Sequence, residues 1–138
     1  QNMNMKPYYS KKVIKHFLNP KNFGEIKDAD GIGRVGNSRC GDEMLLMLKV
    51  GEKDGKEIIK DIKFKTLGCA AAIATSDMIC ELVKNKTLDE ALGVGFKDVA
   101  GELGSLPPVK IHCAYLAQEG LKAAVEDYRN KKKKSKSK

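Results

Sequence analysis

The stretch "EIIKDIKFKTLGCAAAIATSDMICELV", Glu57–Val83, changes from the residue pattern of a strand to that of a helix. Before Gly68, Ile62 and Phe64 alternate with lysines, which is typical of a strand with one buried face. After Gly68, apolar residues recur near helical spacing. The stretch therefore predicts a strand that leads directly into a helix, and it places Cys69 at the entrance of that helix.

Further strands and a helix are expected before this stretch. "EMLLMLKV", residues 43–50, predicts a strand, and the Asp54-Gly55 pair that follows it is a hairpin signal. A glycine-rich segment upstream has room for one short strand around Ile32–Val35. Earlier still, Ser10 is expected to cap a first helix that Asn19-Pro20 ends. The predicted apolar face of that helix is formed by Val13, Ile14, Phe17 and Leu18.

The segments after this stretch are helical. "TLDE", Thr87–Glu90, has the pattern of a capping box that starts a short helix, and another short helical turn is expected over Phe96–Leu103. A long helix is predicted from Pro108 to about Tyr128. Its buried stripe consists of Ala114, Ala117, Leu121, Val125 and Tyr128.

Together these elements predict an α+β fold, in which a small antiparallel three-stranded sheet packs against helices, with a long C-terminal helix and a disordered Lys-rich tail. The length of 138 residues suits one domain. We place this single domain at residues 8–129. Residues 1–7 are expected to be a disordered N-terminal segment, and residues 130–138 a disordered Lys-rich tail.

Composition excludes several classes of protein. The apolar runs are too short to cross a bilayer, and the first residues have no apolar core of the signal-peptide kind, so a soluble, cytoplasmic protein without membrane contact is expected. The net charge is +8, but the final "KKKKSKSK" holds six lysines, which leaves only +2 for residues 1–130. Aromatic residues make up only 6% of the chain. A nucleic-acid-binding domain is therefore not expected.

The four cysteines Cys40, Cys69, Cys80 and Cys113 are widely scattered and form no C-x-x-C motif. In a reducing compartment, disulfides are not the default. The remaining interpretations are buried small residues, a nucleophile, or metal ligands that the fold brings together. Cys80 is in register with the apolar residues of its helix, and we assign it to the core.

The other three cysteines lie at the ends of predicted elements, where loops converge. Helix N-termini, where Cys69 and Cys113 are expected, can lower the pKa of a thiol. With Asp42 or His112, the three thiolates would form a four-ligand set for zinc or for an iron–sulfur cluster. Electron-transfer clusters are usually held by four thiolates. A carboxylate or imidazole in place of one thiolate should make a cluster easier to load and unload, which suits a carrier.

Three motifs, "RCGD", "KTLGCAAAIATS" and "LPPVKIHC", resemble the U-type iron–sulfur cluster scaffold family, IscU, which is related to the N-terminal domain of NifU. The similarity extends from about Tyr8 through Tyr128 and includes "YYSKKVIKHFLNPKNFG" near the start. All three motifs occur in the order of the family. Two departures, an additional residue before the prolines and Ala114 where serine is common, affect no ligand.

The resemblance implies a non-enzymatic scaffold on which a cluster, expected to be 2Fe–2S, is assembled and passed to apo iron–sulfur proteins. Cys40, Cys69 and Cys113 would hold the cluster and accept persulfide sulfur from a cysteine desulfurase. Asp42 and His112 would be the exchangeable or fourth ligands, and zinc could occupy the site when no cluster is bound.

The resemblance also implies a partner for "LPPVK". In the family, a DnaK-type chaperone that works with a J-type co-chaperone recognises a similar segment during cluster release. The matching residues here look like that segment: Leu106, Pro107, Pro108, Val109 and Lys110. Lys110 would also lie close to the metal site. Because prolines cannot continue a preceding helix, the segment is expected to be a stiff extended arm that leads into the helix of His112 and Cys113.

Two other functions are compatible with the same ligands. One is a zinc-bound sulfurtransferase, which accepts persulfide from a desulfurase but builds no cluster. The related branch of this kind, SufU, has a long insertion between its second and third cysteines and typically lacks "LPPVK", so this chain resembles it less. The other is a structural zinc domain whose basic tail binds nucleic acid or an acidic partner.

Overall fold

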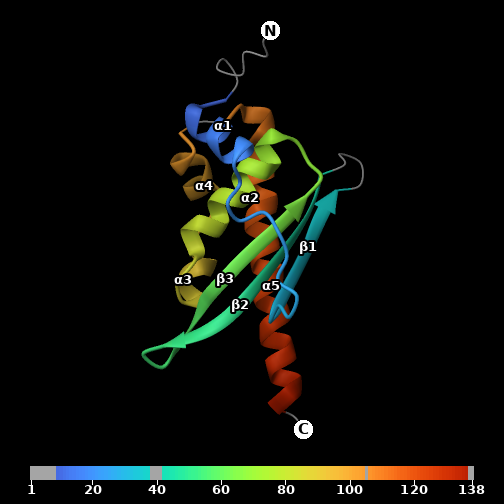
Figure 1. Cartoon of the computed structure of the whole chain (residues 1–138), viewed down its shortest axis with the longest axis vertical. Helices are drawn as coiled ribbons and strands as arrows, with labels where there is room; N and C mark the ends of the chain where they lie inside the picture. Colours follow the sequence, from blue (N-terminus) through green and yellow to red (C-terminus); the bar gives the residue numbers. More distant parts are fainter. Residues whose placement is uncertain (1–8, 38–41, 105, 137–138) are drawn as a thin grey trace.

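The strand and helix predicted at residues 57–83 are present, and they form the centre of the fold (Figure 1). The computed structural model describes residues 9–37, 42–104 and 106–136, without the side chains of Asn37, Asp42 and Lys136. In chain order, the elements are α1 (Lys11–Leu18), β1 (Gly31–Asn37), β2 (Asp42–Lys53), β3 (Lys56–Thr66), α2 (Ala70–Val83), α3 (Leu88–Leu92), α4 (Phe96–Glu102), the 3-10 turn η1 (Pro108–Lys110) and α5 (Ile111–Lys136).

The three strands form one antiparallel sheet in the order β1-β2-β3, which confirms the predicted sheet and the α+β class. The predicted hairpin joins β2 to β3, where Asp54 and Gly55 adopt φ values of 53° and 80°. Glycine adopts such positive values without the steric cost that a Cβ brings, which explains why the Asp-Gly pair marks this turn. The register then places Leu46 opposite Phe64 on the buried face.

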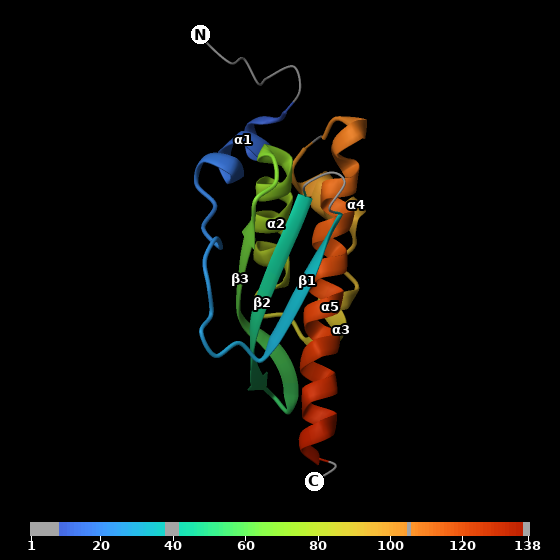
Figure 2. The ribbon, with the colours of Figure 1, turned by 90° about the vertical axis from the view of Figure 1, so that its right-hand side faces the viewer.

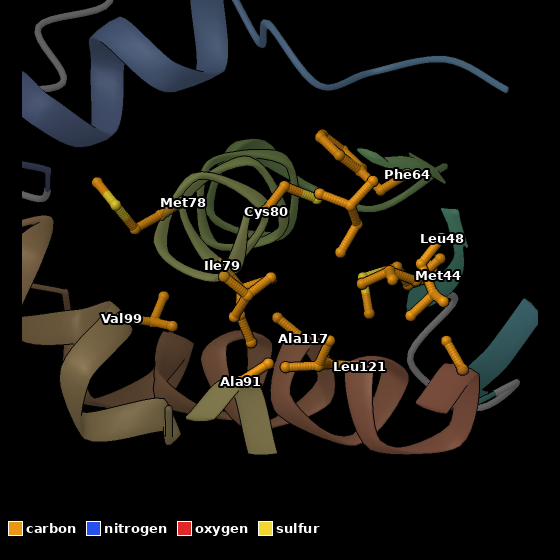
Figure 3. Close-up of a cluster of buried hydrophobic side chains, with 14 of the residues drawn as sticks. Met44, Leu48, Phe64, Met78, Ile79, Cys80, Ala91, Val99, Ala117 and Leu121 are labelled. Carbon is orange, nitrogen blue, oxygen red and sulfur yellow. The ribbon is translucent and has the colours of Figure 1, made fainter. Parts of the chain in front are cut away.

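Helices α2 and α5 lie against one face of this sheet (Figure 2). Helix α2 is buried on nearly all sides, because α1, β3, α4 and α5 all contact it. Figure 3 shows its residues Ile79 and Cys80 among side chains of the sheet, such as Phe64, and of α5, such as Leu121. Cys80 is fully buried there, as predicted. None of the described helices is both long enough and apolar enough to cross a membrane.

Helix α1 has the predicted cap, because the Ser10 hydroxyl oxygen accepts a hydrogen bond of 3.1 Å from the backbone N–H of Val13. Val13 is fully buried, but the placement of Leu18 on the same apolar face was wrong, since Leu18 is 71% exposed. At 100° per residue, Leu18 stands about 140° around the helix from Val13, too far to share one narrow contact with α2.

Helix α5 is longer than predicted. It continues to Lys136, so residues 130–136 are helical, and the prediction of a disordered tail from residue 130 was wrong for them. Lysine is a good helix former, and cations near a helix C-terminus interact favourably with the helix dipole. Lys131 pairs with Asp127 one turn earlier at 2.9 Å, and Lys132 reaches Glu57 of β3 at 2.8 Å. Residues 1–7, 137 and 138 lie outside the described residues.

Candidate functional site

Cys69 is the N-cap residue of α2, as predicted. The turn that places it is fixed by Thr66, whose hydroxyl donates to the carbonyl oxygen of Glu43 and accepts from the backbone N–H of Gly68 at 3.1 Å. The backbone N–H groups of Ala71 and Ala72 point toward the Cys69 sulfur. The thiol therefore lies where the positive end of the helix dipole is strongest.

Cys113 lies in the first turn of α5 and meets Cys69. The two residues belong to a small cluster in which Cys113, with Ala71 and Ala72, is buried, and the Cys113 thiol hydrogen-bonds to the Cys69 sulfur. Two cysteines that are 44 positions apart in the sequence thus come together, because α2 and α5 pack with their N-termini at the same end of the molecule (Figure 1).

The surroundings of Cys69 favour its thiolate. They lower the pKa of Cys69 to about 5, chiefly through the hydrogen bond from Cys113, with further contributions from the N–H groups of α2 and from Lys110, although burial acts in the opposite direction. The Lys110 ammonium lies 3.6 Å from the Cys69 sulfur, and the nearby thiolate raises the pKa of Lys110. A thiolate is the form of cysteine that binds metal and attacks sulfur, so Cys69 is ready for both at neutral pH.

His112 points toward the same cluster. Its Nδ1 lies 2.9 Å from the carbonyl oxygen of Val109, and its Nε2 lies 3.7 Å from the Cys113 sulfur. When Nδ1 carries the proton and donates it to that carbonyl, Nε2 presents its lone pair toward the thiols. His112 is an exposed residue, so a metal bound to its Nε2 would lie close to the surface.

The remaining two predicted ligands are only partly located. Cys40 lies outside the described residues, and for Asp42 the structure gives the backbone alone. Asp42 is the first residue of β2, and Met44, two residues later, pairs with Thr66 at the end of β3. Asp42 therefore begins its strand at the end of the sheet where the chain turns toward Cys69.

The "LPPVK" segment differs from the extended arm that was expected. Only its first part is extended, with Pro107 at φ −54° and ψ 140°, whereas Pro108–Lys110 forms the 3-10 turn η1 and α5 begins at Ile111 rather than Pro108. The fixed φ of proline also fits the first position of a helical turn, which explains why the second proline starts η1. Leu106 packs on the thiol cluster, while Val109 is 74% exposed.

Tyr9 is a residue of the site that the sequence did not suggest. It packs against the thiol cluster, and its pKa is raised by burial and then by the nearby charge of Cys69. Tyr9 directly precedes the N-cap of α1, so the first helix is connected to the thiols through this ring. An aromatic residue next to a helix cap carries no specific chemical signal, which is why it was missed.

The low pKa of Cys69 predicts how the metal-free protein reacts with iodoacetamide. The rate at Cys69 should rise through about pH 5 and level off above it, because the thiolate is the reacting form. A thiol with an ordinary pKa would still be gaining rate at about pH 8.5. Mass spectrometry of peptides after brief labelling measures the rate, with Cys80 as the internal control, since burial raises the pKa of Cys80. A midpoint near pH 8.5 at Cys69 would contradict the proposed stabilisation of its thiolate.

Comparison with known proteins places these features in a family. The sequence model described as "NifU-like N terminal domain" matches residues 8–135. The "Iron-sulfur cluster assembly scaffold protein IscU" of Escherichia coli (strain K12) is 49% identical over 127 residues, which cover 90% of this chain and 96% of the relative. "Iron-sulfur cluster assembly scaffold protein IscU 1" of Archaeoglobus fulgidus is 54% identical over 120 residues, which cover 87% of this chain and 76% of the relative.

Solved structures share the fold at lower sequence identity. A crystal structure of a putative iron-sulfur cluster assembly scaffold protein for the SUF system, from Fervidobacterium islandicum AW-1, has a TM-score of 0.65 and 24% identity, covering 89% of this chain and 99% of that chain. The N-terminal part of a nitrogen-fixing NifU-like protein from Brucella abortus has a TM-score of 0.57 and 19% identity, covering 91% of this chain and 94% of that chain. These likenesses show a common fold.

Proposed function

The chain belongs to the family of NifU-like N-terminal domains, in which it is an iron–sulfur cluster assembly scaffold of the IscU type, and we propose that it assembles a 2Fe–2S cluster on Cys40, Cys69 and Cys113. One observation carries this proposal: the Cys69 thiolate and the Cys113 thiol meet at the N-termini of two helices. Thiolates are the ligands that iron–sulfur clusters require.

The fourth position of the cluster is assigned to Asp42 or His112. A carboxylate or an imidazole is a harder ligand than a thiolate and competes less well for iron in a cluster, so it exchanges more readily. The exposed ring of His112 supports this assignment, because a ligand at the surface can be replaced by a group of an acceptor protein. The same set of thiolates and imidazole suits tetrahedral zinc, which is assigned to the cluster-free protein.

Sulfur is supplied by a cysteine desulfurase. A thiolate of the scaffold attacks the outer sulfur of the desulfurase persulfide, a new sulfur–sulfur bond forms, and the old bond breaks with its electron pair left on the desulfurase cysteine. Of the described cysteines, Cys69 is best suited to this attack, since its pKa is about 5 and it is only half-buried. Leu67, which is 93% exposed beside it, offers an apolar contact to the donor.

Cluster release is assigned to a DnaK-type chaperone and its J-type co-chaperone, with apo iron–sulfur proteins in the cytoplasm as acceptors. The segment Leu106–Lys110 supports this assignment. Val109 is exposed and can be bound by a chaperone, while Lys110 of the same segment contacts the Cys69 sulfur. Movement of the segment would therefore reach the ligands directly. The protein is not an enzyme in this scheme, since each cluster is assembled on the scaffold and then transferred to another protein.

A test separates this function from that of a zinc-bound sulfurtransferase. The metal-free protein is incubated anaerobically with a cysteine desulfurase and cysteine, with and without ferrous iron and a reductant. We expect a brown product with visible charge-transfer absorption only when iron is present. A colourless protein that keeps its zinc and stimulates the desulfurase equally well without iron would favour the sulfurtransferase.

The Asp42→Ala variant should hold its cluster longer than the wild type. The carboxylate offers water or an acceptor thiol a route to iron, so its removal should slow release several-fold. The decay of visible absorption and the rate of transfer to an apo-ferredoxin measure this. Asp89→Ala, which removes an exposed carboxylate on α3, is the control and should leave both rates unchanged. Faster cluster loss in Asp42→Ala would mean that the carboxylate is a required ligand.

A further inference from the structure

A second group of potential metal ligands lies between α1 and α2. His16 of α1 faces Asp77 and Glu81 of α2, with its Nδ1 at 2.6 Å from Oδ2 of Asp77 and at 3.6 Å from Oε2 of Glu81. One ligand atom from each of the three residues lies within 4.8 Å of the others. Asp77 follows Cys69 by eight positions, about 12 Å along the helix, so this group is separate from the thiols.

Asp77 is held as a metal-binding carboxylate would be. It is fully buried, and its Oδ1 accepts hydrogen bonds from the backbone N–H of Asn22 at 2.9 Å and from Asn22 Nδ2 at 3.0 Å. These bonds occupy Oδ1 and direct Oδ2 toward His16. A buried carboxylate is stabilised by hydrogen-bond donors and by positive partners, and a bound cation is one such partner. Hydrogen bonds that orient a ligating carboxylate in this way are a regular feature of metal sites.

The distances fit a small divalent cation. Metal–ligand bonds of about 2.0–2.2 Å place neighbouring ligand atoms about 2.8–3.6 Å apart in octahedral or tetrahedral geometry. Of the two separations from Nδ1, 3.6 Å lies at the upper end of that range and 2.6 Å lies a few tenths of an ångström below it, so binding requires only a small opening between His16 and Asp77. The Glu81 side chain is 40% exposed, which gives a cation access from solvent and room to complete its coordination with water.

We propose that His16, Asp77 and Glu81 bind a divalent first-row cation, such as Mn²⁺, Fe²⁺ or Zn²⁺, which displaces the proton between His16 and Asp77. One imidazole and two carboxylates form a harder ligand set than the thiols, and it suits these ions better than soft ones. The site goes beyond the proposed function. A bound cation would link α1 to α2. Tyr9, which packs on the thiol cluster, lies just before α1 in the chain.

The chain has only two histidines, His16 and His112, which makes a selective test possible. Mn²⁺ is added to the reduced, metal-free protein, and the imidazole signals of both rings are followed by NMR, since the paramagnetic ion broadens the signals of nuclei close to it. We expect the His16 signals to broaden at a Mn²⁺ concentration about tenfold lower than those of His112.

Glu81→Gln should remove this preference by raising the required Mn²⁺ concentration about tenfold at His16 only. Glu126→Gln, an exposed substitution on α5, is the matched control and should change neither ring. Unchanged backbone amide spectra verify that both variants remain folded. Equal broadening of the two rings in the wild type, or unchanged His16 broadening in Glu81→Gln, would overturn the proposal.

Discussion

Cys69→Ser is expected to lose at least nine-tenths of the cluster that the wild type holds after anaerobic reconstitution, while the fold is retained. Serine replaces a thiolate with a pKa of about 5 by a hydroxyl that stays protonated at every relevant pH. The change removes a soft ligand for iron, together with the partner of Lys110 and Cys113. Visible absorption per protein, with iron and acid-labile sulfide content, measures the loss.

Cys80→Ala is the matched control for this variant. It removes the other cysteine associated with α2, which is fully buried in the core and away from the thiol cluster. We expect a modest loss of stability from the small cavity and a normal cluster content. If Cys69→Ser kept as much cluster as Cys80→Ala, Cys69 would not be a ligand, and the site would have to be assigned elsewhere.

Gly33→Ala is expected to destabilise the fold by about 3 kcal/mol or more, which would lower the melting temperature by about 10 °C. Gly33 is part of β1, and β1 packs alongside α5 (Figures 1 and 2). A Cβ at this position would lie 2.3 Å from the carbonyl oxygen of Gly120 and 2.6 Å from the backbone nitrogen of Ala124. Both contacts are with helix backbone, so strand and helix would have to separate.

Gly51→Ala is the control, because a Cβ there meets only side-chain atoms of Lys60, the nearest being its Cβ at 3.2 Å, and no backbone atom. Its free energy of unfolding should stay within about 1 kcal/mol of the wild type, since alanine also restricts the unfolded chain. Urea denaturation at equilibrium measures both variants. Equal stability of Gly33→Ala and Gly51→Ala would mean that β1 and α5 are not packed as closely as described.

Local signals were sufficient to predict most elements of the fold. The alternation around Phe64, the Asp54-Gly55 turn and the capping box at Thr87 each depend on residues that are neighbours in the sequence. One error arose where a distant contact decides the outcome. Lys132 extends α5 partly through Glu57, which is 75 positions away. The error at Pro108 has a local cause, because the fixed φ of proline fits both an extended arm and the first position of a helical turn.

The cysteines and His112 of the candidate site were predicted from residue types at element ends, and Lys110 from the family resemblance. The structure brings Cys69, Cys113, His112 and Lys110 together. Tyr9 could not be predicted, because its role depends on how α1 packs. The same holds for the contact of His16 with Asp77, which joins two helices 61 positions apart. The ligand roles of Cys40, Asp42, Cys69, His112 and Cys113 all remain predictions, and Cys40 and the Asp42 side chain also lie outside the described residues.

The central claim is that the protein assembles an iron–sulfur cluster and transfers it to an acceptor protein. It is tested most directly by following iron and sulfide from the scaffold to the acceptor. The anaerobically loaded protein is mixed with an apo-ferredoxin, the two are separated, and the iron and acid-labile sulfide of each are measured. We predict equal amounts of iron and sulfide on the loaded scaffold, and their joint appearance on the ferredoxin as the scaffold becomes colourless. A scaffold that binds zinc and persulfide but never holds iron and sulfide together, or never passes both on, would contradict the account.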